Sequence, residues 1–160
     1  MCWAITGGAG FLGLHLARRL LAGGNEVRTL DLAPLDDAEL ERSVEEVRGD
    51  VRDPVAATQL AHGADVLVHA AAALPIQASR NSIRSVNVDG TAVVLAAALE
   101  AGVRRAVLIS STAVYGVPSG PSARRVAGPA RPSTGSPARR WNALVASTVL
   151  GPAIASTGPL

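Results

Sequence analysis

The stretch Thr6–Gly13 reads TGGAGFLG and decides the fold of this chain of 160 residues. It follows a short apolar run, Cys2–Thr6, and precedes apolar residues that recur at helical spacing between Phe11 and Leu21. The glycine pair at positions 23–24 then ends that periodicity. The pattern predicts a strand, a tight turn and a helix, in that order.

Further along the chain, apolar runs of strand length alternate with helical patterns. Strands are expected at 26–31, within 44–51, at 65–69 and at 105–110, and helices at about 54–61 and 85–101. Strands that alternate with helices imply right-handed crossovers and a parallel sheet. The sequence therefore predicts an α/β fold, a Rossmann-type doubly wound parallel sheet in the order 3-2-1-4-5. Its core must be built from Ala, Val and Leu, because only 2% of the residues are aromatic.

The three spaced glycines of the opening stretch predict a phosphate-binding turn. Gly7 would permit the tight turn, Gly10 would let the backbone approach a pyrophosphate, and Gly13 would let the helix pack closely on the strand. The backbone N–H groups of Phe11 and Leu12 and the positive end of the helix dipole would face the phosphates. Glycines at this spacing are also found in purely structural turns, so the neighbouring acids matter.

Acidic residues follow the second and third predicted strands. Asp31 ends the second strand, 18 residues after Gly13, where a carboxylate can accept both ribose hydroxyls of an adenosine. This favours NAD over NADP, because a 2′-phosphate would meet a negative charge; the alternative is a strand-end cap or a surface acid. Asp50 and Val51 could contact the adenine edge. Asp53 is expected to cap a helix directly before Pro54.

Six blocks of sequence occur in the order and approximate spacing of the extended short-chain dehydrogenases. They are TGGAGFLG, the acid after the second strand, GDVRD, HAAA at 69–72, NVDGT at 87–91 and SSTAVYG at 110–116. Residues 1–116 therefore resemble the NAD-dependent epimerase/dehydratase group, which acts largely on nucleotide sugars, and the related 3β-hydroxysteroid dehydrogenase-like proteins. The resemblance implies a dinucleotide cofactor and hydride transfer to or from a carbon that bears a hydroxyl group.

The resemblance also implies roles for individual residues. His69, Ala70 and Ala71 would line the cofactor near its nicotinamide ribose, although a buried histidine with a satisfied ring is an equal alternative for His69. Asn87 would brace the central strands by bonding backbone groups.

Three further roles follow for the stretch after the fifth strand. Ser111 matches the catalytic Ser/Thr that orients the reacting oxygen, with Thr112 as the fallback, and a backbone-bonded hydroxyl is the alternative for both. Tyr115 would contact substrate or pack, and would not be the general base.

The chain departs from this family at the catalytic base. Relatives use the tyrosine of a Tyr-x-x-x-Lys motif, in which the lysine charge lowers the tyrosine pKa. Here Tyr115 is the single tyrosine, all 15 residues counted as Lys+Arg are Arg, and positions 138–145, where the motif would be expected, read ARRWNALV. Whether the chain is an enzyme is thus left open, and turnover is expected to be very low or absent.

Composition changes abruptly after residue 116. Residues 1–116 hold 10 Arg against 13 acids, a net charge of −3, whereas residues 117–160 hold 5 Arg and no acid, 7 of the 10 Pro, and 18 residues that are Pro, Gly or Ser. We expect a nucleotide-binding domain at 1–116 and, at 117–160, an irregular tail without a substrate lobe, in which only 141–150 could be ordered. The change suggests a frame-shifted or truncated product, which translation of the other two reading frames past Val117 would test.

Several classes of function are disfavoured. The folded part is mildly acidic and nearly free of aromatic residues, which argues against nucleic-acid binding. Cys2 is the single cysteine, so neither a disulfide framework nor a cysteine-based metal site is expected, and a cytoplasmic setting fits. No signal peptide or membrane segment is predicted, since the longest apolar run, around 64–76, contains charge and is short of a bilayer span.

Three functions compete on this sequence. The first is an NAD-dependent epimerase/dehydratase-type oxidoreductase, inactive as written, and the second is a non-catalytic NAD(P)-binding or redox-sensing module. The third is a structural fragment that binds nothing, expected if the fifth strand is left as an apolar edge. The substrate cannot be read from the sequence, and a homodimer is possible.

Overall fold

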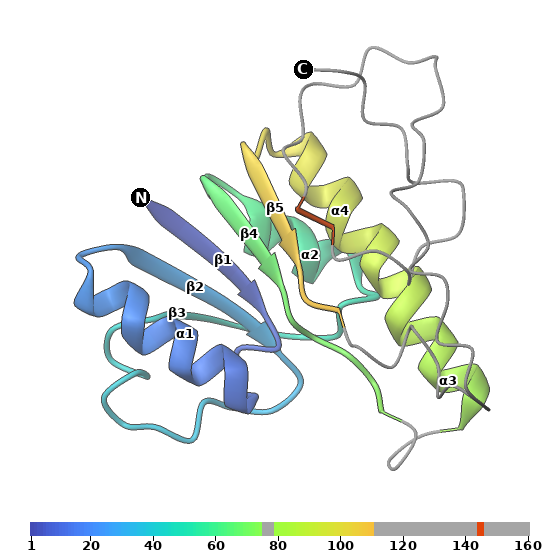
Figure 1. The fold of residues 1–160 in the computed structure, drawn as a ribbon, viewed down its shortest axis with the longest axis horizontal. Helices are drawn as coiled ribbons and strands as arrows, with labels where there is room; N and C mark the ends of the chain where they lie inside the picture. The colour runs from blue at the N-terminus through green and yellow to red at the C-terminus, as the bar shows by residue number, and fades with distance from the viewer. Residues whose placement is uncertain (75–78, 111–143, 146–160) are drawn as a thin grey trace, which may run out of the picture.

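The computed structural model describes residues 1–74, 79–110 and 144–145. Figure 1 labels the elements along the chain. In order they are β1 (Cys2–Thr6), α1 (Phe11–Ala22), β2 (Glu26–Asp31), β3 (Glu45–Arg48), α2 (Pro54–Ala61), β4 (Val66–His69), α3 (Arg80–Arg84), the π-helical η1 (Ser85–Gly90), α4 (Thr91–Glu100), β5 (Arg105–Leu108) and β6 (Leu144–Val145). The predicted α/β class and all five predicted strands are confirmed.

All strand pairs of the sheet are parallel, in the order β3-β2-β1-β4-β5-β6. The first five strands follow the predicted order 3-2-1-4-5. The sixth comes from within 141–150, the one part of the tail expected to be ordered, and pairs with β5 at Val107 and Leu108. The fifth strand is therefore not a wholly unpaired edge, contrary to the premise of the structural-fragment hypothesis.

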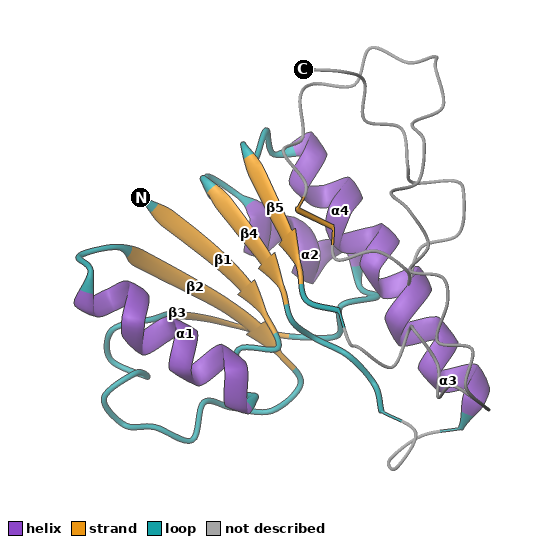
Figure 2. Cartoon of the chain, in the orientation of Figure 1, coloured by secondary structure: helices purple, strands orange, loops and turns teal. Residues whose placement is uncertain are grey.

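Helices cover both faces of the sheet (Figures 1 and 2). On one face α1 and the connection 32–44 pack over Ile5, Val27 and Val68, whereas α2 and α4 cover the other face. Small side chains dominate this second interface, and they include Ala4, Ala56, Ala57, Ala61, Ala97, Ala98 and Ala106. Alanine lets the helices approach the sheet closely, as the low aromatic content predicts.

The long helix before β5 differs from the prediction. It begins at Arg80 rather than near residue 85, and its middle turn, Ser85–Gly90, is π-helical. Gly90 is buried there, and a Cβ on it would lie 2.7 Å from Val51 Cγ2. The glycine thus lets the helix pack against the loop after β3.

The stretch Asn81–Glu100 has the length and hydropathy of a membrane span among the described residues. A core helix of a soluble protein passes the same test, and α4 packs on α2 and on the core of the sheet. One such helix is therefore weak evidence for a membrane.

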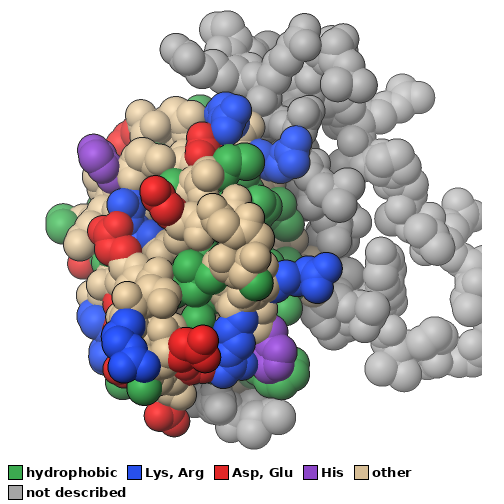
Figure 3. All heavy atoms as spheres, turned by 90° about the vertical axis from the view of Figure 1, so that its left-hand side faces the viewer, with side chains coloured by type: hydrophobic (Ala, Val, Ile, Leu, Met, Phe, Trp, Pro, Cys, Tyr) green, Lys and Arg blue, Asp and Glu red, His purple; other side chains and the backbone are tan. Residues whose placement is uncertain are grey.

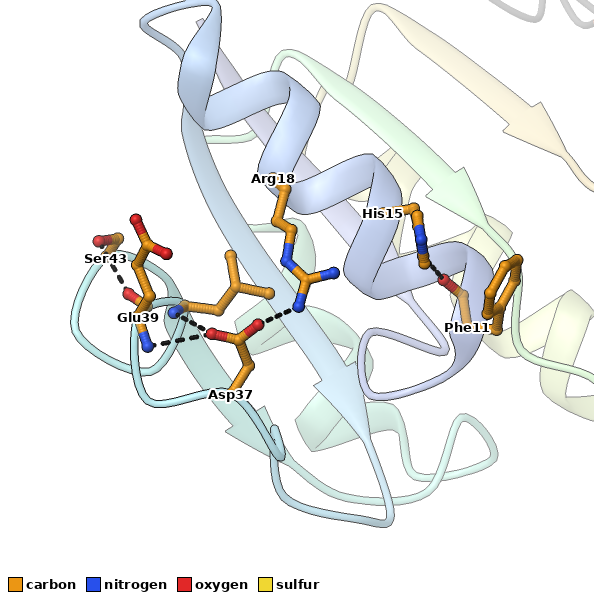
Figure 4. A network of polar contacts seen from close by, with 7 residues as sticks. Phe11, His15, Arg18, Asp37, Glu39 and Ser43 are labelled. Carbon is orange, nitrogen blue, oxygen red and sulfur yellow. Dashed lines mark hydrogen bonds and ion pairs between the residues drawn. The ribbon is translucent and has the colours of Figure 1, made fainter.

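The connection between β2 and β3 is fixed to α1 by one carboxylate (Figure 4). Asp37 forms an ion pair with Arg18 of α1, and its Oδ1 accepts from the backbone N–H groups of Glu39 and Leu40, each at 3.0 Å. These hydrogen bonds, led by the one from Leu40, hold the pKa of Asp37 below its usual value. The turn they close buries Leu40 against the sheet.

At the amino-end side of the sheet, Arg28 of β2 caps the last turn of α2. Its Nη1 lies 3.2 Å from the carbonyl oxygens of both Gln59 and Leu60, and its Nε lies 2.7 Å from Glu45 Oε2. A cation here satisfies carbonyl groups that have no partner within the helix.

On the face shown in Figure 3, acidic and basic side chains are interspersed and form no single basic patch. Nucleic-acid binding usually uses a basic stripe, and this face of the described residues does not offer one.

Candidate functional site

The carboxyl ends of β1, β2 and β4 meet at one edge of the sheet. β1 lies between β2 and β4, so the chain leaves β1 where the strand order reverses. In open parallel sheets this reversal leaves a crevice in which ligands bind. The glycine-rich turn after β1, Asp31 and the loop after β4 are therefore in the position expected of a site.

Two glycines of the turn are required by the fold itself. Gly7 has a φ of +73°, and a Cβ on it would lie 2.8 Å from Ala71 N. A Cβ on Gly13 would lie 2.1 Å from Gly7 O, so α1 can begin under the turn only without a side chain there. The expected roles of Gly7 in the turn and Gly13 in close packing agree with this geometry.

Gly10 differs from these two glycines because one side of it is open. Among the described residues, the nearest atom to a Cβ built on Gly10 is Gly7 O at 3.2 Å, and no other atom of a non-neighbouring residue lies within 4 Å. The residue is exposed at the start of α1. The surrounding protein therefore leaves room for another molecule to approach its backbone.

Sequence reasoning gave no role to Gly8. It is buried, and a Cβ on it would lie 2.4 Å from the Cβ of Thr29 in the neighbouring strand β2. Gly8 thus sets the closeness of the turn to β2. The glycine pair at positions 7–8 is the sequence feature that could have indicated this close approach.

The carboxylate of Asp31 bonds back to the glycine-rich turn. Its Oδ2 accepts from Ala9 N at 3.0 Å and its Oδ1 from Ala33 N at 3.1 Å. The side chain is half-buried at the end of β2. Asp31 therefore lies beside the turn, as the hypothesis of a shared site for Asp31 and the glycines requires.

The first turn of α1 presents apolar side chains and free backbone donors at this edge. Phe11 is 81% exposed and Leu12 45% exposed. The ring of Phe11 packs 4.3 Å from that of His15, whose Nδ1 lies 2.7 Å from Phe11 O (Figure 4). No side chain in the described part of the chain caps this helix start, and the N–H groups of a first turn have no acceptor within their helix.

In the loop after β3, the side chain of Asp50 has a partner within the loop itself. Its carboxylate is engaged by Arg52, with Oδ1 2.9 Å from Arg52 Nε and Oδ2 2.5 Å from Nη2, and these bonds lower the pKa of Asp50. Val51 is buried and touches the position of Gly90. As expected, Asp53 caps α2, accepting from Val55 N at 2.9 Å.

The ring of His69 lies inside the fold. It is 5% exposed, with Nδ1 2.7 Å from Thr6 Oγ1 and Nε2 2.9 Å from Thr91 Oγ1. Burial lowers the pKa of His69 to about 4, so the ring is neutral at physiological pH. Both ring nitrogens are satisfied, which agrees with the structural alternative stated for this residue.

The loop after β4 is fixed at both ends. The N–H groups of Ala70 and Ala71 donate to Thr6 Oγ1 at 3.1 and 3.2 Å. The amide of Asn87 accepts from Ala73 N at 2.7 Å and donates to Ala73 O at 3.0 Å. Asn87 therefore bonds backbone groups as expected, but those of the loop after β4 and not those of a central strand.

The predicted catalytic residues Ser111 and Thr112, and also Tyr115, lie outside the described residues. Within the described residues, no group of three or more His, Cys, Asp or Glu side chains could hold a metal ion.

Comparison with known proteins gives one consistent family. The sequence profile of the 3-beta hydroxysteroid dehydrogenase/isomerase family matches residues 4–123, which extends past the expected boundary at 116. The 3 beta-hydroxysteroid dehydrogenase/Delta 5-->4-isomerase of Mycobacterium tuberculosis is 35% identical, over 69% of this chain and 31% of its own length. The chain spans about a third of the length of the curated relatives it matches.

Two solved structures have the same fold and were determined with bound NAD. A short-chain dehydrogenase/reductase superfamily protein from Agrobacterium tumefaciens is 34% identical, with a TM-score of 0.65, over 72% of this chain and 34% of that chain. The dTDP-glucose 4,6-dehydratase of Streptomyces venezuelae is 35% identical, with a TM-score of 0.66, over 75% and 42%.

Proposed function

Because the chain belongs to the 3-beta hydroxysteroid dehydrogenase/isomerase family of NAD-dependent short-chain oxidoreductases, we propose that residues 1–116 form an NAD-binding module. The observation that carries this proposal is the joining of Asp31 to the glycine-rich turn through Ala9 N, beside the open side of Gly10. A carboxylate and an unobstructed backbone at one strand edge suit a ribose diol next to a pyrophosphate.

Each part of the site would hold one part of the cofactor. The backbone N–H groups of Phe11 and Leu12 would donate to the phosphates, together with the approach that Gly10 permits. Asp31 would accept from the adenosine ribose hydroxyls. The backbone of Asp50–Val51 would border the adenine, because the Asp50 carboxylate is engaged by Arg52.

The loop after β4 would line the opposite side of the crevice. Ala70 and Ala71 would contribute backbone there, while the His69 ring stays in the interior. The preference for NAD over NADP rests on the negative charge of Asp31.

The reaction of the family supplies the second part of the proposal. When bound, NAD exchanges a hydride with a carbon that bears a hydroxyl group. The substrate of the longer proteins would be a small hydroxyl-bearing molecule such as a nucleotide sugar, which the similarity to a dTDP-glucose dehydratase supports. Ser111, or Thr112 in its place, would orient the reacting oxygen.

One feature of the sequence favours a second function for the chain as written. It contains no lysine, and its single tyrosine is not part of a Tyr-x-x-x-Lys motif. A phenol is a poor base at neutral pH without a neighbouring positive charge. We therefore infer a non-catalytic NAD(P)-binding or redox-sensing module, distinguished from an active enzyme by a hydride-transfer assay with candidate nucleotide sugars and sterols. A cytoplasmic location and a homodimer stay predictions.

Isothermal titration with NAD and NADP tests the binding proposal. Gly10→Ala should keep the fold, because the added Cβ meets a single backbone oxygen at 3.2 Å, but should weaken NAD binding about tenfold or more by filling the approach. Gly23→Ala, at the far end of α1, is the matched control, since that glycine has an ordinary φ of −84°. Equal NAD affinity in Gly10→Ala and the unaltered chain, or no binding in the unaltered chain, would refute the proposed site.

A further inference from the structure

A chain of hydrogen bonds crosses the interior from the end of β1 to the π-helical turn. It runs from Thr6 through His69 and Thr91 to the backbone oxygen of Asn87. Thr6, His69 and Thr91 are each 5% exposed or less. Water cannot readily replace a partner at such positions, so each donor must meet an acceptor.

The direction of the first bond follows from the valence of the Thr6 hydroxyl. A hydroxyl oxygen has one hydrogen and two lone pairs. Both lone pairs of Thr6 Oγ1 face donors: one is Ala71 N, and the other is Ala70 N, which shares its hydrogen with the Thr6 carbonyl oxygen at 3.2 Å. Thr6 must therefore donate its hydrogen to His69 Nδ1, which must be unprotonated.

The Thr91 end of the hydrogen-bond chain indicates the same tautomer of His69 independently. Thr91 Oγ1 lies 2.7 Å from the carbonyl oxygen of Asn87, which can only accept, so Thr91 donates there. Its remaining contact, with His69 Nε2 at 2.9 Å, must then be one in which Thr91 accepts. The hydrogen of a neutral His69 ring therefore sits on Nε2.

We propose that His69, as the neutral Nε2–H tautomer, is a positioning residue that orients the hydroxyls of Thr6 and Thr91 and thereby fixes the loop Ala70–Ala73 at the edge of the cofactor crevice. The loop abuts the glycine-rich turn, since a Cβ on Gly7 would lie 2.8 Å from Ala71 N. The far end of the loop, at Ala73, is bonded to the side-chain amide of Asn87. The backbone oxygen of Asn87 is the last acceptor of the hydrogen-bond chain. One ring thus connects both attachment points of the loop.

A charged His69 would break this arrangement. A proton on Nδ1 would face a Thr6 oxygen whose lone pairs are already occupied by Ala70 and Ala71. None of the hydrogen bonds and ion pairs among the described residues joins a charged side chain to this ring, so nothing in them would offset the added charge. Burial alone already lowers the pKa of His69 to about 4.

The relevance to NAD rests on the proposed function, but the tautomer itself does not. Long-range ¹H–¹⁵N spectra of the full chain report which ring nitrogen carries hydrogen, and the exposed rings of His15 and His62 serve as internal references. We expect an unprotonated Nδ1 and a protonated Nε2 in His69 at neutral pH. The opposite tautomer, or a charged ring at pH near 6.5, would overturn the proposal.

Amide exchange and NAD titration test the consequence for the loop. Thr6→Val and Thr91→Val should each speed exchange of the Ala70 and Ala71 amides and weaken NAD binding about tenfold. Thr6→Ser, which keeps the hydroxyl, should restore both readouts, and Thr58→Val on the exposed face of α2 should change neither.

The outcomes separate the two proposals. Unchanged exchange and unchanged NAD affinity in both valine variants would refute the positioning role of His69. Absence of NAD binding in the unaltered chain would refute the proposed function, while the tautomer and the exchange of the loop amides would still decide whether His69 fixes the loop.

Discussion

At the scale of single residues, the residues of the proposed site divide into those that would contact the cofactor and those that hold the surrounding structure in place. The open side of Gly10 belongs to the first group and Thr6 and His69 to the second, whereas Asp31 belongs to both, because its carboxylate also accepts from Ala9 N and Ala33 N. The two groups require different experiments, because substitutions in the first should change ligand affinity and those in the second should also change stability.

Asp31→Asn should weaken NAD binding about 10- to 100-fold, the range for losing a charged hydrogen-bond partner. It should reduce the discrimination against NADP as well, because the charge that opposes a 2′-phosphate is removed. Parallel titrations of both cofactors measure the two effects. Asp36→Asn removes an exposed acid from the same connection and should leave both affinities unchanged. Equal loss in the two variants would show that net charge, and not position, is responsible.

His69 should make stability depend on pH in a defined window. Its pKa is about 4 in the folded chain and near 6.5 when unfolded. Above pH 6.5 both states are neutral; as pH falls from 6.5 towards 4 only the unfolded state binds the proton, so stability decreases. The total loss is about 3 kcal/mol, from 1.36 kcal/mol per pKa unit.

Urea unfolding of the chain at a series of pH values measures this loss. His69→Gln should be less stable at neutral pH but should lack the slope between about 6.5 and 5, above the range in which Asp37 and Asp50, whose pKa values are lowered, add a slope of their own. His62→Gln, which replaces an exposed ring, should retain the slope. A slope that persists in His69→Gln would assign it to other groups.

At the scale of elements, a helix or strand was predictable where the residues that mark its start or end lie next to it in the sequence. α2 spans Pro54–Ala61 and β2 spans Glu26–Asp31, both as predicted, because a capping acid with proline and a glycine pair mark their starts. The π-helical turn Ser85–Gly90 was missed, since it accompanies the packing of Gly90 against Val51, a contact distant in the sequence.

The start of α2 offers a local test of this reasoning. Asp53→Ala should lower the free energy of unfolding by about 1 kcal/mol, the usual contribution of an N-cap, because Val55 N loses its acceptor. Asp53→Asn keeps a side-chain oxygen at the cap and should cost only a few tenths of that amount. Thermal or urea unfolding of the two variants measures the difference, and similar losses in both would contradict a capping role.

At the scale of the whole molecule, alternation of strands and helices was sufficient to predict five strands in their order, because right-handed crossovers leave few topologies. It did not predict the pairing of Leu144–Val145 with β5, which joins segments far apart in a stretch of weak pattern. At the site, the meeting of Asp31 with the glycine-rich turn was predictable from adjacent strand ends. The His69–Thr91 bond was not, since no sequence pattern reports how a buried ring is satisfied.

Cofactor binding should stabilise the fold as a unit. At an NAD concentration one hundred times Kd, linkage adds about 2.7 kcal/mol to the free energy of unfolding, which for a chain of this size raises Tm by about 5–10 °C. Differential scanning calorimetry with NAD, with NADP and without cofactor measures the shift. At the same NAD concentration Gly10→Ala, with Kd about tenfold higher, should show about half of the shift or less. An equal shift with both cofactors would contradict the preference assigned to Asp31.

Arg28, which caps α2, stabilises the fold at a place far from the proposed ligand site. Its side chain joins the C-terminal end of α2 to β2 and β3 at the amino-end side of the sheet. The glycine-rich turn lies at the opposite, carboxyl-end edge. Substitutions near Arg28 that raise Tm should thus leave the proposed cofactor site unchanged. Thermal stability and ligand specificity should therefore be able to change independently of each other in this fold.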